Sequence, residues 1–273
     1  MKSLLVILLV LTGLWSASPA FAQESDAPPP VLEVRVPLIL SERPHDAQAF
    51  TQGLLLHDGL FYESTGLYGQ STLREVDPAT GEVLRRFNLP AEIFAEGLAL
   101  VGDRLIQLSW REGVAIEYAL DTFEPARIYN YNTEGWGLCY DGVDLWMSDG
   151  SASLFRRDAD TFALIETLPV TMGGRPVLRL NELECVGDSV YANVWMDDHI
   201  VVIDKQTGVV HTLIDASAIV ASLGLQDDTS AVLNGIAYDP ASAVFYITGK
   251  LWPALYEVRF VPYLPASTPL RFP

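Results

Sequence analysis

The chain has 273 residues, of which 49% are hydrophobic and 10% aromatic, enough to bury a large core within one all-β domain. Its 35 acidic residues against 17 basic residues give a formal net charge of −18 at pH 7. A field of this sign repels phosphate backbones and anionic lipids, so the composition argues against nucleic acids and membrane surfaces as partners.

Residues 1–22, MKSLLVILLVLTGLWSASPAFA, have the pattern of a secretory signal peptide. Lys2 precedes a short apolar run, and Ala20-Phe21-Ala22 matches an A-x-A cleavage site. A retained N-terminal anchor is the alternative, but no later segment offers the roughly 20 apolar residues of a membrane span. We therefore expect an exported protein, in a bacterial periplasm or secreted, with no membrane span after signal cleavage.

Residues 23–30, QESDAPPP, predict a short disordered lead-in, and residues 31–273 predict a single domain. Within this domain one unit recurs: a polar residue, usually a glycine, a short apolar strand, a Gly/Asp/Pro turn and a second strand. The segments are FTQGLLLHDGLFYEST (50–65), FAEGLALVGDRLIQLSW (94–110), NTEGWGLCYDGVDLWMSDG (132–150), LNELECVGDSVYANVW (180–195) and LNGIAYDPASAVFYITGK (233–250). Strand-only units with a period of about 40–45 residues predict the four-stranded blades of a propeller.

A second hairpin with Asp/Thr/Gly turns follows each of the first four units, at residues 72–89, 115–131, 153–170 and 200–215. The fifth unit has only ALYEVRF, residues 254–260, and lacks a partner strand after it. The apolar stretch 31–40, VLEVRVPLIL, can supply that strand and remove an exposed edge. The sequence thus predicts a five-bladed β-propeller whose last blade is closed by an N-terminal strand. The rival all-β fold, a sandwich, does not explain five similar units.

This topology brings the start of each innermost strand and the end of the next strand to the same rim of the ring. Each residue alone also has a structural interpretation, because polar strand starts often bond loop backbone and Trp is often core. Together, however, they predict a pocket with aromatic walls and a few polar groups at the channel mouth. The strand starts are Gln52, Glu96, Glu134, Trp136 and Asn181, and the ends are Glu63, Trp110, Asp149, Trp195 and Lys250.

The chain resembles the plant and bacterial type of glutaminyl-peptide cyclotransferase, or glutaminyl cyclase. The motifs that carry the resemblance run in order from about residue 45 to 258: AFTQGL, YESTGLYGQSTLREVD, FAEGL, QLSW, EGWGL, SDGS, LNELE, YANVW, VLNGIAYD and TGKLWP. The resemblance implies a five-bladed propeller that cyclises N-terminal glutamine of peptides or proteins to pyroglutamate with release of ammonia. It also implies an enzyme unrelated to the zinc-dependent animal type, with no metal and no cofactor.

The resemblance also implies individual roles. Glu96 of FAEGL is the catalytic acid/base. The aromatic pocket residues are Phe50, Phe94, Trp110, Trp136 and Trp195, and the polar ones are Gln52, Asn181 and Lys250. Glu63 and Glu134 remain rim residues without an assigned role. A monomer is expected.

The chemistry of ring closure fits these residue types. One carboxylate between two nitrogens can take a proton from the attacking α-amine and deliver it to the departing amide nitrogen. Two other functions stay open: a non-catalytic binding propeller, and a metal-dependent lactonase-type hydrolase with a cation held by Glu and Asn. A disulfide between Cys139 and Cys185 is also left open, since the exported compartment permits one and buried free cysteines are common. His45 is expected to be solvated in a loop.

Overall fold

The computed structural model describes residues 32–225 and 227–264. The predicted signal peptide, residues 1–22, and lead-in, residues 23–30, lie outside these ranges, as does the first residue of the predicted strand 31–40. The described chain is all-β apart from one short helix, α1 (Ser217–Ser222). No helix in this part of the chain is long and apolar enough to cross a membrane.

Three consecutive stretches of the chain each form a four-stranded antiparallel sheet. The first sheet contains β2 (Thr51–His57), β3 (Leu60–Thr65), β4 (Thr72–Val76) and β5 (Val83–Asn88). The second contains β6 (Ala95–Val101), β7 (Arg104–Ser109), β8 (Val114–Ala119) and β9 (Pro125–Asn130). The third contains β10 (Leu138–Tyr140), β11 (Asp144–Met147), β12 (Ser153–Asp158) and β13 (Leu164–Pro169).

The rest of the chain forms a small hairpin and a larger sheet. The hairpin pairs β14 (Thr171–Met172) with β15 (Arg175–Pro176). The larger sheet has eight strands, in the order β16 (Leu180–Val186), β17 (Ser189–Val194), β18 (His199–Asp204), β19 (Val210–Asp215), β1 (Glu33–Pro44), β22 (Ala254–Pro262), β21 (Val244–Gly249) and β20 (Leu233–Asp239).

The N-terminal strand β1 lies between two parts of the chain that are far away in sequence. It pairs antiparallel with β22 along most of its length and parallel with β19 over residues 33–35. The pairing expected between residues 31–40 and 254–260 is therefore present, and β1 continues beyond it to Pro44. Because β1 covers the edges of both neighbours, neither β19 nor β22 is left as a fully open edge.

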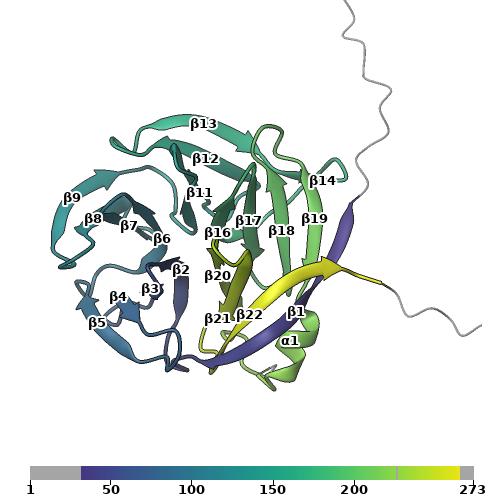
Figure 1. Cartoon of the computed structure of the whole chain (residues 1–273). Coiled ribbons are helices and arrows are strands. Elements are labelled where there is room, and N and C mark those ends of the chain that lie inside the picture. Colours follow the sequence, from purple (N-terminus) through teal and green to yellow (C-terminus); the bar gives the residue numbers. More distant parts are fainter. Residues whose placement is uncertain (1–31, 226, 265–273) are drawn as a thin grey trace, which may run out of the picture.

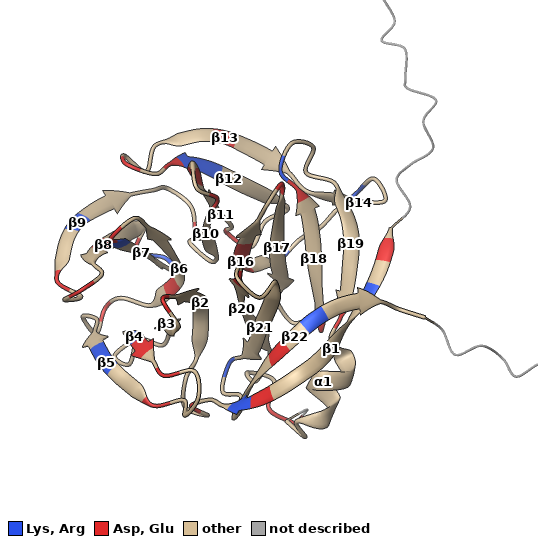
Figure 2. Ribbon diagram, viewed as in Figure 1, with Lys and Arg blue, Asp and Glu red and all other residues tan. Residues whose placement is uncertain are grey.

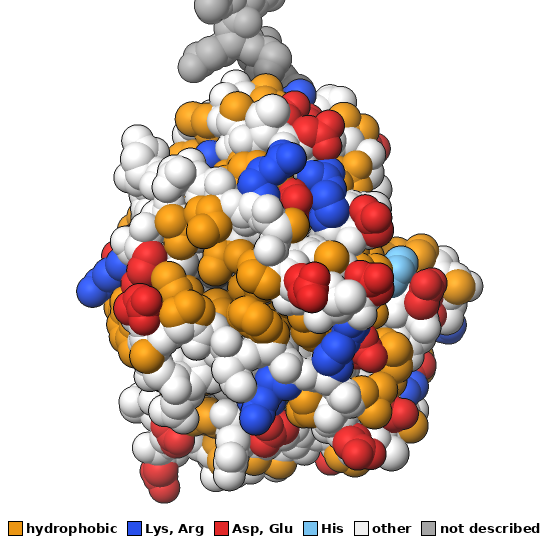
Figure 3. Space-filling model, turned by 90° about the vertical axis from the view of Figure 1, so that its left-hand side faces the viewer, with side chains coloured by type: hydrophobic (Ala, Val, Ile, Leu, Met, Phe, Trp, Pro, Cys, Tyr) orange, Lys and Arg blue, Asp and Glu red, His pale blue; other side chains and the backbone are white. Residues whose placement is uncertain are grey.

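The sheets surround a common centre (Figure 1). The innermost strands contact one another in a closed cycle, β2 with β6, β6 with β10, β10 with β16, β16 with β20 and β20 with β2. The apolar core of the described residues consists of five clusters. Four of them lie between neighbouring sheets, and the fifth lies within the eight-stranded sheet, between its β16–β19 part and its β20–β22 part. Inner strands are buried on both faces, as in β6, whereas the outer strand β5 alternates between exposed and half-buried residues. Outer strands thus face water, and Figure 3 shows acidic and basic side chains around apolar ones on the side that carries β5 and β9.

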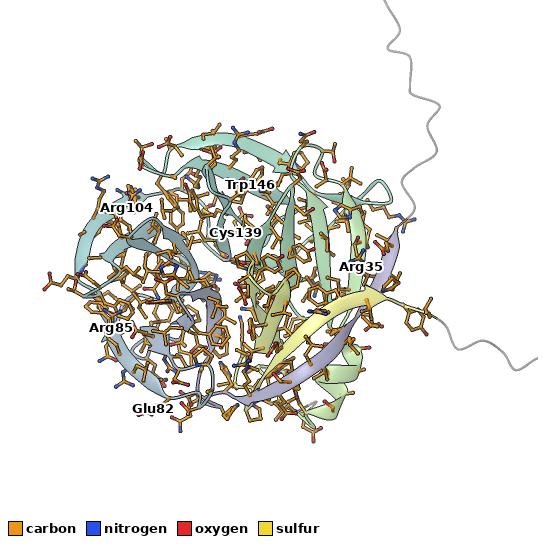
Figure 4. All side chains as sticks on the ribbon, in the orientation of Figure 1. Arg35, Glu82, Arg85, Arg104, Cys139 and Trp146 are labelled. Carbon is orange, nitrogen blue, oxygen red and sulfur yellow. A yellow bond between two sulfur atoms is a disulfide. The ribbon has the colours of Figure 1, made fainter. Side chains whose placement is uncertain are left out.

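A disulfide joins two innermost strands of neighbouring sheets. Cys139 on β10 and Cys185 on β16 are bonded, with an S–S distance of 2.00 Å, and Cys139 lies close to the centre of the ring in Figure 4. The bond settles the alternative that the sequence left open. It closes a loop with a sequence separation of 46 residues, which restricts the unfolded chain.

Candidate active site

A cavity of about 250 Å³ opens at the rim where the innermost strands begin. It brings together all nine pocket residues that the family resemblance implied, and one more, Leu67. The lining residues are Phe50, Gln52, Leu67, Phe94, Glu96, Trp110, Trp136, Asn181, Trp195 and Lys250. They come from all parts of the ring, so the cavity exists only when the ring is closed.

The local hairpin geometry explains why Glu96 and Trp110 meet. Glu96 is the second residue of β6, and Trp110 directly follows β7, the antiparallel partner of β6. The backbone N–H of Trp110 donates to the carbonyl of Phe94 at 2.9 Å, which closes the open end of this hairpin. The start of the first strand and the end of the second therefore share one rim.

A β-bulge lies at the polar start of several innermost strands. The antiparallel register shifts at Gln52 on β2, at Glu96-Gly97 on β6 and at Asn181 on β16. Bulges re-aim side chains and are common beside active sites. The glycine that follows the polar residue is required for packing, because a Cβ on Gly97 would lie 2.5 Å from the backbone nitrogen of Leu138. The recurring polar-glycine pair thus combines an aimed side chain with close approach of the next innermost strand.

Glu96 is buried, with 5% of its surface exposed, and has a defined partner. The amide nitrogen of Gln52 donates to its Oε1 at 3.0 Å. Asn234 in turn donates to the amide oxygen of Gln52 at 3.3 Å, so that the orientation of the Gln52 amide is fixed. Figure 2 shows acidic positions, in red, on inner strands such as β6 and β16 as well as at the outer edge of the ring.

Burial raises the pKa of Glu96 well above its usual 4.5. The positive charge of Lys250 opposes this shift, and the negative charges of Glu134 and Glu112 add to it. Burial also lowers the pKa of Lys250 to about 8, although the charge of Glu96 acts in the other direction. A carboxyl group whose pKa is raised in this way holds a proton more readily than an exposed one, so it can accept a proton and return it.

Aromatic rings form two walls of the cavity. On one side, Phe94 lies edge-on to Phe50 at 6.2 Å between ring centroids and contacts Trp110 at 5.3 Å. On the other, Trp136 and Trp195 are T-shaped at 5.6 Å. Such pairs are stabilised by ring electrostatics as well as by burial.

Two polar side chains complete the lining. Asn181 is buried, and its Oδ1 has no hydrogen-bond partner among the described residues. The ammonium nitrogen of Lys250 lies 4.8 Å from the centre of the Phe50 ring, a cation–π distance. A buried acceptor and a buried cation in one cavity suit a ligand with N–H groups and a developing negative oxygen.

Comparison with known proteins agrees with this geometry. The family model described as glutamine cyclotransferase matches residues 6–260. The chain belongs to the glutamine cyclotransferase family. It is similar to the glutaminyl-peptide cyclotransferase of Arabidopsis thaliana, at 40% identity over 225 residues, which cover 81% of this chain and 70% of that one. It is also similar to the crystal structure of Myxococcus xanthus glutaminyl cyclase, at 42% identity and a TM-score of 0.80, over 85% of this chain and 99% of that one.

Glu63 does not belong to the cavity of this glutamine cyclotransferase. It pairs with Leu54 well inside the first hairpin, so the expectation that it lies at the rim was wrong. Its carboxylate accepts hydrogen bonds from Thr51 at 2.7 Å and from the ring of His45 at 3.0 Å. His45 is accordingly buried, where a solvated loop was expected, and its other ring nitrogen lies 2.7 Å from the carbonyl oxygen of Trp252.

For three further residues of this glutamine cyclotransferase the structure adds to or corrects the sequence analysis. Asp149 accepts a hydrogen bond from the backbone of Ser151 at 3.0 Å and does not line the cavity. Leu67 lines it with a left-handed backbone, φ +86°, and was missed because it lies beyond the end of β3. Glu134, without an assigned role from sequence, contacts both Trp110 and Trp136. Among the described residues no three His, Cys, Asp or Glu side chains are grouped to hold a metal ion.

Proposed function

We propose that this protein converts N-terminal glutamine of peptides and proteins to pyroglutamate with release of ammonia. Family membership supports this reaction, and so do the names of the Arabidopsis and Myxococcus relatives. The observation that carries the proposal is a buried carboxyl group, Glu96, in an aromatic cavity of about 250 Å³, which suits one amino-acid residue.

In the proposed reaction Glu96 moves one proton between two nitrogens. The neutral α-amine attacks the side-chain amide carbon of the same glutamine, forming the C–N bond of the five-membered ring. Ionised Glu96 takes the proton that this amine loses and gives it to the amide nitrogen, whose bond to carbon then breaks to release ammonia. Atoms and protons balance without any other reactant, and the carboxylate is regenerated.

The other lining residues supply orientation and charge in this proposal. The walls formed by Trp110, Trp136 and Trp195 hold the side chain bent, which removes an entropic barrier to ring closure. The free Oδ1 of Asn181 accepts an N–H of the substrate, and Lys250 stabilises the negative oxygen of the tetrahedral intermediate.

The number of blades in the fold is also part of the proposal. We infer a five-bladed propeller, in which β20, β21 and β22 form the last blade and β1 closes it. The closed cycle of five innermost strands and the five apolar clusters, one of which divides the eight-stranded sheet into two parts, support this count. Export after removal of residues 1–22, and action as a monomer, complete the proposal.

Incubation with a peptide that begins with glutamine tests the function directly. The expected product is lighter by about 17 Da, one ammonia, and one equivalent of ammonia is released. Activity that survives a strong chelator would exclude the alternative function, a metal-dependent lactonase-type hydrolase. No mass change with any glutamine-initiated peptide would leave a binding module as the better description.

A further inference from the structure

A single carboxylate joins the two aromatic walls of the cavity. The Oε2 atom of Glu134 accepts the indole N–H of Trp110 at 2.8 Å and the indole N–H of Trp136 at 3.0 Å. These tryptophans come from neighbouring sheets, one directly after β7 and the other just before β10. Glu134 itself does not line the cavity.

The main chain fixes the position of this carboxylate. The N–H of Gly135 donates to the carbonyl of Trp110 at 2.8 Å, and the N–H of Trp136 donates to the carbonyl of Ser148 at 3.0 Å. A Cβ on Gly135 would lie 2.6 Å from the carbonyl oxygen of Ser109, so only glycine allows the loop to lie this close to β7. Glu134 is therefore held over the gap between the two indoles.

The carboxylate is also kept ionised. Its Oε1 accepts the guanidinium Nε of Arg111 at 3.2 Å, and this guanidinium stacks on the ring of Trp110 at 3.7 Å. Although partial burial acts against it, the indole and guanidinium hydrogen bonds hold the pKa of Glu134 below its usual value. An ionised acceptor makes stronger hydrogen bonds than a neutral one, so both indoles are firmly oriented.

We propose that Glu134 is a positioning residue for ring closure: it holds Trp110 and Trp136 at the separation that keeps the glutamine side chain bent. This inference rests on the proposed cyclisation. Glu134 acts through the two tryptophans and touches neither the substrate nor the reacting atoms. Small displacements of positioning groups can cost up to about a hundredfold in rate.

Two substitutions separate the hydrogen bonds of Glu134 from its charge. Glu134→Ala removes both, whereas Glu134→Gln keeps one oxygen for the two indoles and removes the charge. Glu112→Gln is the matched charge control, because Glu112 also raises the pKa of Glu96 but accepts hydrogen bonds from Tyr68 and from the backbone N–H of Phe94, both of which a Gln oxygen can accept, and from no indole.

The charged and titratable groups around Glu96 determine how kcat depends on pH. They are Lys250, Glu134, Glu112, Tyr68 and Tyr131. Removing a negative charge at position 134 or 112 makes Glu96 easier to ionise, so each Gln variant shifts the acidic limb of kcat to lower pH. Only the loss of the indole contacts is expected to raise KM and to lower kcat at the pH optimum.

Steady-state ammonia release from a glutamine-initiated peptide tests these expectations. We expect kcat/KM of Glu134→Ala to fall by at least about tenfold, and that of Glu134→Gln and Glu112→Gln to stay within about threefold at their pH optima. An active Glu134→Ala protein within about twofold of wild type would overturn the inference. A wild-type protein that releases no ammonia would instead overturn the proposed function.

A double-mutant cycle covers the case in which Glu134→Ala weakens the fold. Trp110→Phe keeps an aromatic wall but lacks the indole N–H that Glu134 accepts. If the two residues act as one unit, the double variant loses no more than about threefold beyond Glu134→Ala alone, because interacting residues are non-additive. If instead the losses of kcat/KM caused by Glu134→Ala and Trp110→Phe multiply in the double variant, and all variants are folded, the inference would also be overturned.

Discussion

Replacing Glu96 with Gln tests the proton transfer with the least change in shape. The substitution keeps an oxygen that can accept the Gln52 hydrogen bond, 3.0 Å in the structure, and keeps the volume of a buried side chain. It removes the group that accepts a proton from the amine. Lys250 and the aromatic walls stay in place, so the residues that line the binding cavity are retained.

The magnitude follows from losing proton transfer alone. General acid–base catalysis contributes about 10²–10⁴-fold, which corresponds to roughly 2.7–5.4 kcal/mol of transition-state stabilisation. We therefore expect kcat to fall by at least about a hundredfold, with KM changed by less than about threefold. Gln at position 96 also removes the charge that raises the pKa of Lys250, so the pKa of Lys250 moves further down, and this adds to the loss of rate.

The Glu96→Gln substitution is expected to lower activity without lowering the stability of the fold. The raised pKa of Glu96 means that the folded state disfavours its ionised form, so ionisation costs stability once the pH exceeds the usual value of 4.5. A neutral Gln avoids this cost. The unfolding midpoint of Glu96→Gln at pH 7–8 should therefore equal or exceed that of wild type.

The assay is ammonia release from a saturating glutamine-initiated peptide, with thermal unfolding measured on the same samples. Glu112→Gln serves as the control, since it removes a nearby charge outside the cavity lining. Turnover by Glu96→Gln above about a tenth of wild type would refute the proton-transfer role of Glu96. Glu63 could not then replace it, because its carboxylate is bonded to His45 and Thr51 away from the cavity.

Three further outcomes are expected. Trp195→Ala, which truncates a half-exposed wall, should raise KM and lower kcat in ammonia-release kinetics with little change in urea unfolding; a large loss of stability with unchanged kinetics would make it a core residue. Replacing Cys139 and Cys185 with Ala should lower the free energy of unfolding by up to about 4 kcal/mol, measured by urea denaturation, because the loop they close is long. Burial opposes protonation of His45, but the Glu63 carboxylate raises its pKa above 6.5, so its stabilisation is complete below pH 6.5 and is lost as pH rises through the raised pKa. Urea midpoints of wild type and His45→Gln should therefore converge from pH 6 to pH 9, and a constant difference would contradict this assignment.

The sequence by itself determined the hairpins, their recurrence and the rim at which they meet. Alternating apolar residues and Gly/Asp turns define local pairing, and pairing of consecutive strands needs no information from distant parts of the chain. Glu96 and Trp110 were thus predictable neighbours, because the hairpin of β6 and β7 joins them. The family motifs in turn identified the cavity residues, including Gln52 and Lys250, that come from other sheets.

Only the tertiary structure decided which side chains face the cavity and which bind each other. Strand periodicity assigns a face by alternation, but the register shifts at the polar strand starts, so alternation fails at the residues that matter. Glu63 and Glu96 were both expected at the rim, although the carboxylate of Glu63 is bonded to His45 and Thr51 and Glu96 lines the cavity. The contact of Glu134 with two indoles and the Cys139–Cys185 bond both span neighbouring sheets, and their geometry is set by ring closure, which no local pattern encodes.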